Sequence, residues 1–300
     1  MDILHIDTGA EMRGGQRQAF LLLCALREAG HQIALLARKN SPLYVLAKDA
    51  GLYCSPASLG SVFRNSSAAD IVHAHDARAH LLASLAARRP FVVSRRVAFP
   101  VKQSFTSRWK YSRAVRYLAV SEYVAAELRK AGIDRRKIDV VYDAVDEKKP
   151  GIYDPAAPAV ALRSSDPQKG RDLIEAASEL SGIPVSFSEN LALDLQRASM
   201  LVYITRSEGL GSAALLAMSM GIPVIASEIG GLAEVFENGV SGLYTANAPD
   251  RIGAAMRRLV QSPALAEKLI VNARLRVQER FSVESMLRGT LASYQKVLDA

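Results

Sequence analysis

The chain has 300 residues with a formal net charge of +8; 49% of the residues are hydrophobic and 23% are charged. This composition favours a globular enzyme with a sizeable core, and because no apolar run reaches about 18 residues, it argues against a membrane-spanning helix. The positive charge lies in the first half, since residues 1–150 carry 24 Lys and Arg against 14 Asp and Glu, whereas residues 151–300 carry 14 against 16.

The first residues, MDILHID, contain no basic leader followed by an apolar segment. We therefore expect a cytoplasmic protein whose membrane contact, if there is one, is peripheral and on the inner face of the cytoplasmic membrane. Cys24 and Cys54 lie in apolar surroundings without CxxC or His-rich spacing, so we expect two core residues rather than a disulfide or a zinc site.

The first half alternates apolar runs with helical patterns. Helices are predicted over residues 16–29 and 122–131, and strands in the runs ILHID, QIALLA, DIVHAH, FVVSRR, YLAVS and IDVVYD. Strands that alternate with helices predict a parallel sheet covered on both faces. Residues 146–159, DEKKPGIYDPAAPA, break this pattern with charge, Pro and Gly, and we interpret them as an interdomain linker.

The second half begins the same alternation again. Its predicted strands are AVALR, PVSFS, MLVYIT and PVIAS, and its predicted helices cover residues 170–180, 191–198, 249–260 and 283–298, with a further loop and helix after MLVYIT. The sequence thus predicts an α/β protein of two doubly wound parallel-sheet domains, residues 1–147 and 148–300, with a ligand cleft beyond the strand ends. The last helix is a candidate to return to the first domain.

A basic region separates Asp76 from Glu122, with ten basic residues and no acidic one. Its members are Arg78, Arg88, Arg89, Arg95, Arg96, Lys102, Arg108, Lys110, Arg113 and Arg116, and the aromatic residues Phe99, Phe105, Trp109 and Tyr111 lie among them. This pattern suits an anionic phospholipid surface or a phosphorylated acceptor better than nucleic acid. The alternative is a solvated basic face without a partner.

Two stretches predict phosphate contacts. In TGAEMRGGQRQ, Gly14 and Gly15 stand between a strand and a helix, where the backbone can approach a phosphate. The stretch lacks the spacing of GxGxxG and of GxxxxGK[ST], so an ordinary turn is an equal alternative. In LRSSDPQKGRDL, Arg163 ends a strand and Lys169 precedes a helix, so both cations can converge on a diphosphate unless they are only surface charge.

The stretch RSEGLGSAALLAM places Glu208 after a strand and before a helix that opens with Gly209, Leu210, Gly211 and Ser212. The glycines allow backbone amides to approach a ligand, and a carboxylate there can accept hydrogen bonds from sugar hydroxyls. Alternatively, Glu208 only interacts with the helix dipole while Ser207 or Ser212 is the N-cap. His75, at the end of DIVHAH, is predicted to face the same cleft, or to be a structural histidine.

In these residues the chain resembles the retaining glycosyltransferases of family 4. The resemblance spans nearly the whole chain, and its most specific part is the ordered run SEGLGSAALLAMSMGIPVIASEIGGLAEVFENGVSGLYT. It implies the GT-B fold, two Rossmann-like domains that face each other across a cleft, and a nucleoside diphosphate sugar as donor. It also implies a role in transfer to an envelope glycan or a lipid-linked acceptor, such as in lipopolysaccharide biosynthesis, without a bound metal or another cofactor.

The resemblance assigns roles to the residues that match its motifs. Gly14 and Gly15 match a loop near the donor phosphates, and Arg163 and Lys169 match the basic pair on the diphosphate. His75 matches a catalytic histidine near the transferred sugar. Glu208 matches the first carboxylate of an E-x7-E motif that holds sugar hydroxyls, and the turn of residues 209–212 matches donor-binding backbone.

The chain departs from the family at two places. Leu216 stands where the second Glu of E-x7-E is expected to bind the nucleotide ribose, so a hydrogen-bond acceptor is missing. The interval between Arg163 and Glu208 is also short, which predicts a second domain smaller by one strand. These departures favour, as an alternative, a catalytically impaired scaffold or binding subunit; a nucleotide-sugar epimerase is a third hypothesis.

Overall fold

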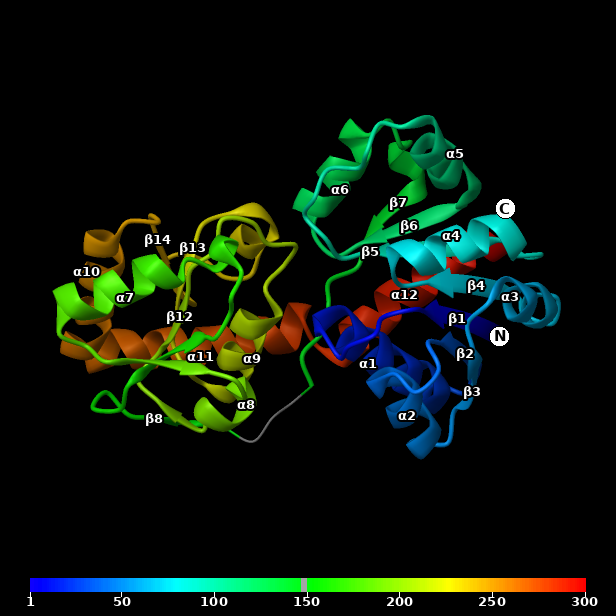
Figure 1. Ribbon diagram of the computed structural model, residues 1–300. Helices are drawn as coiled ribbons and strands as arrows, with labels where there is room; N and C mark the ends of the chain where they lie inside the picture. The colour runs from blue at the N-terminus through cyan, green and yellow to red at the C-terminus, as the bar shows by residue number, and fades with distance from the viewer. Residues whose placement is uncertain (147–149) are drawn as a thin grey trace. The chain divides into compact units, whose positions relative to one another are not determined.

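The computed structural model describes residues 1–146 and 150–300, which form two compact units (Figure 1). The first unit contains Met1–Asp143 and Val283–Ala300, and the second contains Ala144–Ser282. The chain therefore passes through the whole second unit before its last helix joins the first. The boundary predicted between residues 147 and 148 lies outside the described residues.

The first unit is built on a seven-stranded sheet in the order β3-β2-β1-β4-β5-β6-β7, and every neighbouring pair is parallel. Its strands are β1 (Asp2–Asp7), β2 (Gln32–Ala37), β3 (Tyr53–Pro56), β4 (Ile71–Ala74), β5 (Phe91–Arg95), β6 (Arg116–Ala119) and β7 (Ile138–Val140). Its helices are α1 (Gly14–Glu28), α2 (Pro42–Asp49), α3 (Leu59–Ser66), α4 (Ala77–Ala86), α5 (Phe105–Arg113), α6 (Glu122–Lys130) and α12 (Val283–Leu298), with a 3-10 turn at Arg135–Lys137.

The predicted strands and helices of the first unit are confirmed, since each apolar run overlaps one of these strands and α1 and α6 overlap the two predicted helices; the run IDVVYD continues three residues past the end of β7. The central strands are apolar because both of their faces are buried, as at Ile3, Leu4 and Ile6. The strand β3 and the helices α2 to α5 were not predicted from the sequence. β3 is an edge strand whose residues are exposed or half-buried, so it has no continuous apolar run.

The last helix, α12, is fixed to the first unit by buried polar contacts. Tyr294 is fully buried, and its hydroxyl lies 2.6 Å from Nδ1 of His73 on β4. On β7, the carboxylate of Asp139 accepts hydrogen bonds from Ser293 at 2.8 Å and Lys296 at 2.6 Å. These contacts join residues more than 150 positions apart in the sequence, so periodicity alone could not reveal them.

The second unit has a five-stranded parallel sheet in the order β10-β9-β12-β13-β14, and a separate two-stranded sheet of β8 and β11. Its strands are β8 (Ile152–Tyr153), β9 (Ala159–Leu162), β10 (Val185–Ser188), β11 (Arg197–Ala198), β12 (Leu201–Tyr203), β13 (Val224–Ser227) and β14 (Leu243–Thr245). Its helices are α7 (Arg171–Ser181), α8 (Leu191–Asp194), α9 (Ser212–Met220), α10 (Pro249–Gln261) and α11 (Pro263–Arg280), with 3-10 turns at Pro167–Lys169 and Gly230–Glu234.

Three expectations for the second unit need correction. The predicted helix over residues 191–198 ends at Asp194, because Arg197 and Ala198 pair with β8. The predicted linker therefore contributes a strand, and Ile152 donates a backbone hydrogen bond of 2.7 Å to the carbonyl of Gln196. The helix α11 was missed; its buried positions, which include Leu269 and Val277, are separated by charged residues.

Within the described parts of the chain, none of the helices combines the length and the apolar character needed to cross a bilayer. Cys24 and Cys54 are free thiols, and they are half-buried rather than core residues. Partial burial raises the pKa of both thiols, so the thiolate form is disfavoured.

Four histidines are buried in the first unit: His5, His73, His75 and His80. Burial lowers the pKa of His5 and that of His80 to about 3, and it lowers the pKa of the other two well below the ordinary value. The folded protein therefore holds all four rings in the neutral form at neutral pH.

We predict that the protein loses stability as the pH falls from 6.5 toward 5. In the unfolded chain these histidines titrate near pH 6.5, so acid favours unfolding until the pH reaches the lower folded-state pKa. Each ring contributes a loss of about 2 kcal/mol at pH 5 relative to neutral pH. Urea unfolding at several pH values measures this slope, and His80→Phe should reduce it. An unfolding free energy that stays constant between pH 7 and 5 contradicts the prediction.

Candidate functional site

The predicted functional residues follow the carboxyl ends of parallel strands. In the first unit, Gly14 and Gly15 come after β1 and His75 comes after β4. In the second unit, Arg163 follows β9 and Glu208 follows β12. This edge of a parallel sheet is where ligands bind in doubly wound folds. Each unit therefore has its own group of candidate residues.

In the second unit, Lys169 and Glu208 form an ion pair. Lys169 Nζ lies 2.9 Å from Glu208 Oε2, and the two side chains are 26% and 18% exposed. The same oxygen accepts a short hydrogen bond from the Tyr203 hydroxyl, and the Lys169 ammonium also lies over the Tyr203 ring. Burial, and next the carboxylate of Glu208, raise the pKa of Tyr203 well above its usual value, so its hydroxyl remains a donor.

The loop that carries Lys169 is held against the end of β12. The carbonyl of Gln168 accepts hydrogen bonds from Arg206 N at 2.8 Å and Thr205 Oγ1 at 3.2 Å. Gly170 follows in the left-handed region, at φ 57°, and a Cβ there would lie 2.7 Å from Ile204 Cγ2. Only glycine fits this position without backbone strain and without displacing Ile204. The sequence thus fixes Lys169 beside Glu208 through backbone contacts.

The turn after Glu208 is built on glycine. Gly209 N donates to Glu208 Oε1 at 3.0 Å, and Gly211, at φ 119°, is the N-cap of α9. Leu210 is buried and Ser212 is exposed at the first position of α9. In the described structure α9 has no side-chain cap, so the alternative that Ser207 or Ser212 caps the helix is wrong. The amides at this end of α9 stay available to a ligand.

Arg163 has a different partner from Lys169. Its Nη1 atom lies 2.6 Å from Oε1 of Glu189, and both side chains are mostly exposed. The convergence of Arg163 and Lys169 on one diphosphate stays a prediction. Leu216 lies half-buried on α9 and offers no hydrogen-bonding atom.

In the first unit, the loop before α1 is fixed by Asp7. This buried carboxylate accepts hydrogen bonds from Gly9 N at 2.8 Å and from Gln16 Nε2 at 3.2 Å. Burial raises the pKa of Asp7. Gly14 and Gly15 open α1, and a Cβ on Gly15 would meet only the Arg96 side chain, at 3.9 Å. Packing therefore does not require a glycine at position 15.

His75 is buried, with an exposed fraction of 6%. Its Nε2 atom lies 2.9 Å from Nδ1 of His5, and its Nδ1 atom lies 3.3 Å from Nη1 of Arg96. His73 belongs to the same cluster, and its two ring nitrogens contact Ser94 Oγ at 2.8 Å and Tyr294 OH at 2.6 Å. His75 thus has both nitrogens engaged inside the protein.

The three rings of His5, His73 and His75 are close enough to suggest a metal site, because one nitrogen of each lies within 4.8 Å of the others. Two observations disfavour a cation there. Arg96 already places a positive charge against His75, and both nitrogens of His73 have hydrogen-bond partners. The cluster is better described as a set of neutral, hydrogen-bonded rings.

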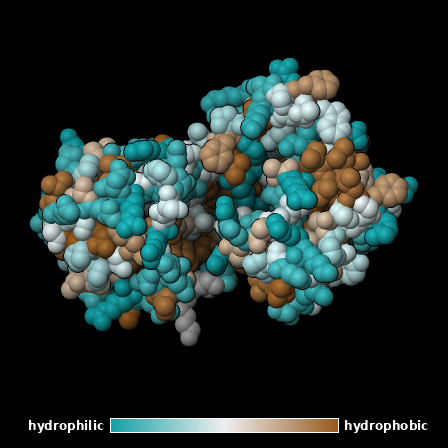
Figure 2. All heavy atoms as spheres, in the orientation of Figure 1, coloured by the Kyte–Doolittle hydropathy of each residue, from teal (hydrophilic) through white to brown (hydrophobic). Residues whose placement is uncertain are grey.

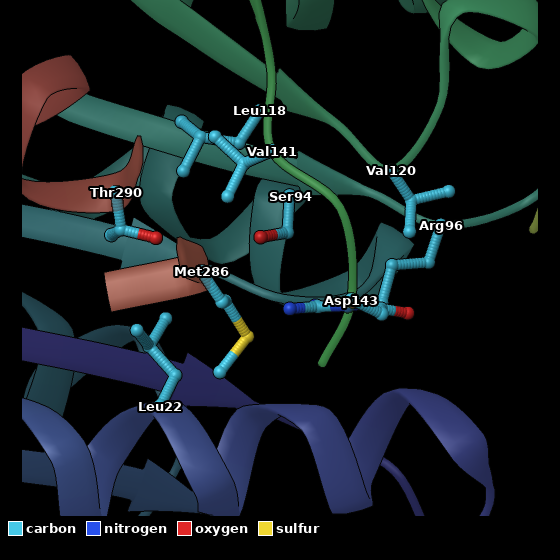
Figure 3. Close-up of a pocket in the computed structure, with 9 residues that line it drawn as sticks. All are labelled: Leu22, Ser94, Arg96, Leu118, Val120, Val141, Asp143, Met286 and Thr290. Atoms are coloured by element: carbon cyan, nitrogen blue, oxygen red, sulfur yellow. The ribbon is translucent and has the colours of Figure 1, made fainter. Parts of the chain in front are cut away.

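Arg96 connects this cluster to the edge of the sheet. Its Nε atom donates to Asp143 Oδ1 at 2.8 Å, and each of these two side chains is 13% exposed. Figure 3 shows the two side chains meeting beside a small cavity. That cavity, also lined by Ser94, Met286 and Thr290, has a volume of about 10 Å³, so it is too small for a sugar or a phosphate.

The basic region divides into structural and exposed residues. Arg96 and Arg116 form ion pairs with Asp143 and Asp139, and Arg95 contacts Tyr111 and the Phe99 carbonyl. Lys102, Arg108 and Arg113 are exposed.

The helix α5, which carries Arg108 and Arg113, has no buried residue along its described length, and Phe105 at its start is 86% exposed. Around α5, Figure 2 shows white and light brown side chains, which are less hydrophilic, among teal ones. An open groove of about 690 Å³ also lies between α5 and the end of α6. Its lining includes Arg108, Tyr111, Lys130 and Lys137. The exposed part of the region is thus a mixed aromatic and cationic surface.

Several residues of these groups were not predicted from the sequence. Tyr203 was assigned only to a strand, and Arg96 only to the basic region. Their contacts to Glu208 and His75 join different elements, so no spacing rule could find them. Asp76 was also missed, although a strand-end Asp before a helix is a known signal for an N-cap; it accepts from Arg78 N and Ala79 N and from the Thr8 hydroxyl.

Comparison with known proteins identifies two sequence families in the chain. The model of glycosyltransferase family 4 matches residues 12–149, and the model of glycosyl transferases group 1 matches residues 184–276. A D-inositol 3-phosphate glycosyltransferase of Rhodococcus erythropolis is 36% identical over 121 residues, which cover 40% of this chain. An MMP alpha-(1->4)-mannosyltransferase of Mycolicibacterium hassiacum is 33% identical over 129 residues, or 42% of this chain. The matched regions span only 27% and 30% of these two relatives.

Among solved structures, Anabaena Alr3699/HepE in complex with UDP and glucose has a similar fold. The TM-score is 0.83 at 16% sequence identity, and the alignment covers 98% of this chain and 99% of that chain. The parallel sheets of both units agree with this likeness in fold. Together with the two matched sequence families, these observations show that the chain belongs to glycosyltransferase family 4 and has the GT-B fold with two Rossmann-like units.

Proposed function

We propose that the protein is a retaining glycosyltransferase that moves a hexose or heptose from a nucleoside diphosphate sugar to an envelope glycan or a lipid-linked acceptor. The observation that carries this proposal is the ion pair of Lys169 and Glu208 beside the free amino end of α9. A cation, a carboxylate and backbone amides at one strand end can bind a phosphate and sugar hydroxyls together. The membership of the family supports the same reaction.

In this proposal Lys169 and Glu208 exchange partners when the donor binds. Lys169 turns from the carboxylate to the diphosphate and stabilises the negative charge that develops on the leaving nucleoside diphosphate. Glu208, still held by the Tyr203 hydroxyl and by Gly209 N, accepts hydrogen bonds from the sugar. Because Lys169 and the amides of α9 supply the positive charge, we expect that no metal ion is required.

The donor that we would test first is a UDP-sugar. The structure of Anabaena Alr3699/HepE was determined with UDP and with UDP-glucose, and its fold is similar to that of this chain. Gly14 and Gly15 of the first unit, and the turn of residues 209–212 in the second, are the proposed backbone contacts to the donor. Arg163 would join Lys169 on the diphosphate after release from Glu189.

A catalytically impaired scaffold is the second candidate function. The observation that favours it is Leu216, which gives the nucleotide ribose no hydrogen-bond acceptor at the position where the family has a carboxylate. A scaffold of this kind would keep the fold and could still bind a glycan, but it would not release nucleoside diphosphate.

For the proposed transfer reaction, we also infer that the acceptor is bound to a membrane. The surface of α5 and the segment before it combines exposed Phe105 and Trp109 with Lys102, Arg108 and Arg113. Aromatic side chains beside cations are typical of surfaces that adsorb to anionic phospholipid. We therefore propose that the protein works on the inner face of the cytoplasmic membrane, where a lipid-linked acceptor is accessible.

We predict that Lys169→Gln and Glu208→Ala each lower donor turnover by about 100-fold or more, because each removes a charge aimed at the donor. The assay is release of nucleoside diphosphate from a panel of UDP-, GDP- and ADP-sugars in the presence of EDTA. Arg171→Gln is the matched control for charge, since Arg171 forms an ion pair with Glu175 on α7 and lies over the Phe187 ring. The control should keep wild-type turnover and all variants should keep wild-type melting temperatures within a few degrees.

The donor panel separates the two candidate functions. Thermal stabilisation by a nucleoside diphosphate that disappears in Lys169→Gln supports the enzyme. Indifference to every nucleotide together with no turnover supports the scaffold and contradicts the proposed transfer reaction. If Glu208→Ala unfolds the protein, Glu208 is mainly a structural residue of the turn.

We predict that changing Lys102, Arg108 and Arg113 together to Gln weakens adsorption to vesicles that contain anionic phospholipid. Each basic residue near such a surface contributes about 1 kcal/mol, and salt screens the attraction. Vesicle co-sedimentation at low and high salt measures the effect. The control variant changes Arg251, Arg258 and Lys268 of the second unit, which are also exposed. Equal adsorption of both variants at low salt would leave α5 without a membrane role.

A further inference from the structure

The hydrogen bonds around Arg96 have only one possible direction. A guanidinium only donates, so Nδ1 of His75, 3.3 Å from Arg96 Nη1, must be the acceptor. A neutral His75 then carries its proton on Nε2, which donates to Nδ1 of His5 at 2.9 Å. His5 in turn carries its proton on Nε2, an atom that is buried and has no partner in the described structure. The contacts therefore fix one tautomer for each ring.

The surroundings keep these rings uncharged. His73 from β4 lies beside both rings and is itself bound by Ser94 from β5 and Tyr294 from α12, and Arg96 with its partner Asp143 contacts His75. Burial is the largest cause that lowers the pKa of His5, His73 and His75, and the positive charge of Arg96 lowers each of them further. Neutral His75 has no nitrogen left for a substrate, because both already have partners inside the unit.

Arg96 itself is held on one side only. Nε donates to Asp143 and Nη1 donates to His75. No described residue accepts a hydrogen bond from Nη2, and this atom is not buried. The side chain lies next to Gly15, just beyond the carboxyl end of β5. A guanidinium that is fixed at two atoms and open at the third is pre-organised to bind an oxyanion.

We propose that Arg96, rather than His75, is the side chain of the first unit that binds substrate, through a phosphate oxygen. His75 is then a positioning residue: together with Asp143 it accepts a hydrogen bond from Arg96 and so orients the guanidinium. This inference rests on the proposed transfer reaction and names a substrate contact that the resemblance to the family did not assign. The phosphate belongs either to the donor diphosphate or to a phosphorylated acceptor.

The test compares three variants of the full chain. Arg96→Met removes the charge and the fork, and we expect kcat/KM to fall about 100-fold. Arg96→Lys keeps the charge but not the fork that Asp143 and His75 hold, so we expect an activity between those of Arg96→Met and wild type. His75→Gln keeps an acceptor for Arg96, because its amide oxygen can replace Nδ1, and should also lose less than about tenfold. Activity of Arg96→Met equal to wild type, or a larger loss in His75→Gln than in Arg96→Met, overturns the proposal.

The kinetic constants also identify the source of the phosphate. A raised KM for the donor in Arg96→Met, with weaker binding of UDP, assigns the contact to the donor diphosphate. Unchanged donor KM and unchanged donor hydrolysis without acceptor, with slower transfer, assigns it to the acceptor. Either result supports Arg96 as the binding residue.

A spectroscopic measurement tests the contact between His75 and Arg96 separately from turnover. In protein labelled with 15N histidine, the His75 signals, assigned by their loss in His75→Gln, should show protonated Nε2 and unprotonated Nδ1 from pH 5.5 to 8. In Arg96→Met this single tautomer should be lost. A wild-type His75 protonated on Nδ1 overturns the proposal. Because this measurement needs no donor, its failure is distinct from a failure of the proposed transfer reaction.

Discussion

Parallel strand direction is the constraint on which both units depend. All strands of each main sheet run the same way, so every loop that leaves a carboxyl end reaches the same edge. In the first unit this brings His75 and Arg96 together from the ends of β4 and β5, and it places Asp7 of β1 where its carboxylate interacts with the charge of Arg96. In the second it brings Lys169 and Glu208 together across 39 positions of sequence. Neither group would form in a sheet of alternating strand directions.

Much of this architecture could be predicted, because buried parallel strands are continuous apolar runs. QIALLA and PVIAS are examples in which the predicted strand and β2 or β13 agree closely. Prediction was weaker where a strand is short: β8 lies in the segment predicted to be a linker, and its partner β11 lies in the segment predicted to be a helix. The helix α11 shows the same limit, since its buried residues are spaced among charges.

The charged residues of the candidate site could be predicted from the sequence, but the residues that hold them in place could not. Lys169 could be named from its position before a helix and Glu208 from its position after a strand, but the ion pair between them was not predicted. Tyr203 and Gly170, which hold them, have roles that arise from contacts between elements. His75 could be recognised as a strand-end histidine, but its burial and its two internal partners depend on β1 and Arg96.

The return of α12 to the first unit has a consequence for the order of folding. His73 cannot be covered by Tyr294, nor Asp139 bound by Lys296, until the ribosome has made the last residues of that helix. By that time residues 144–282 have all been synthesised. The unit that starts first is therefore the one completed last. Until then its buried histidines and the cavity beside Arg96 lack the residues that α12 contributes. A nascent chain should acquire the second unit's ion pair before the first unit's buried polar cluster.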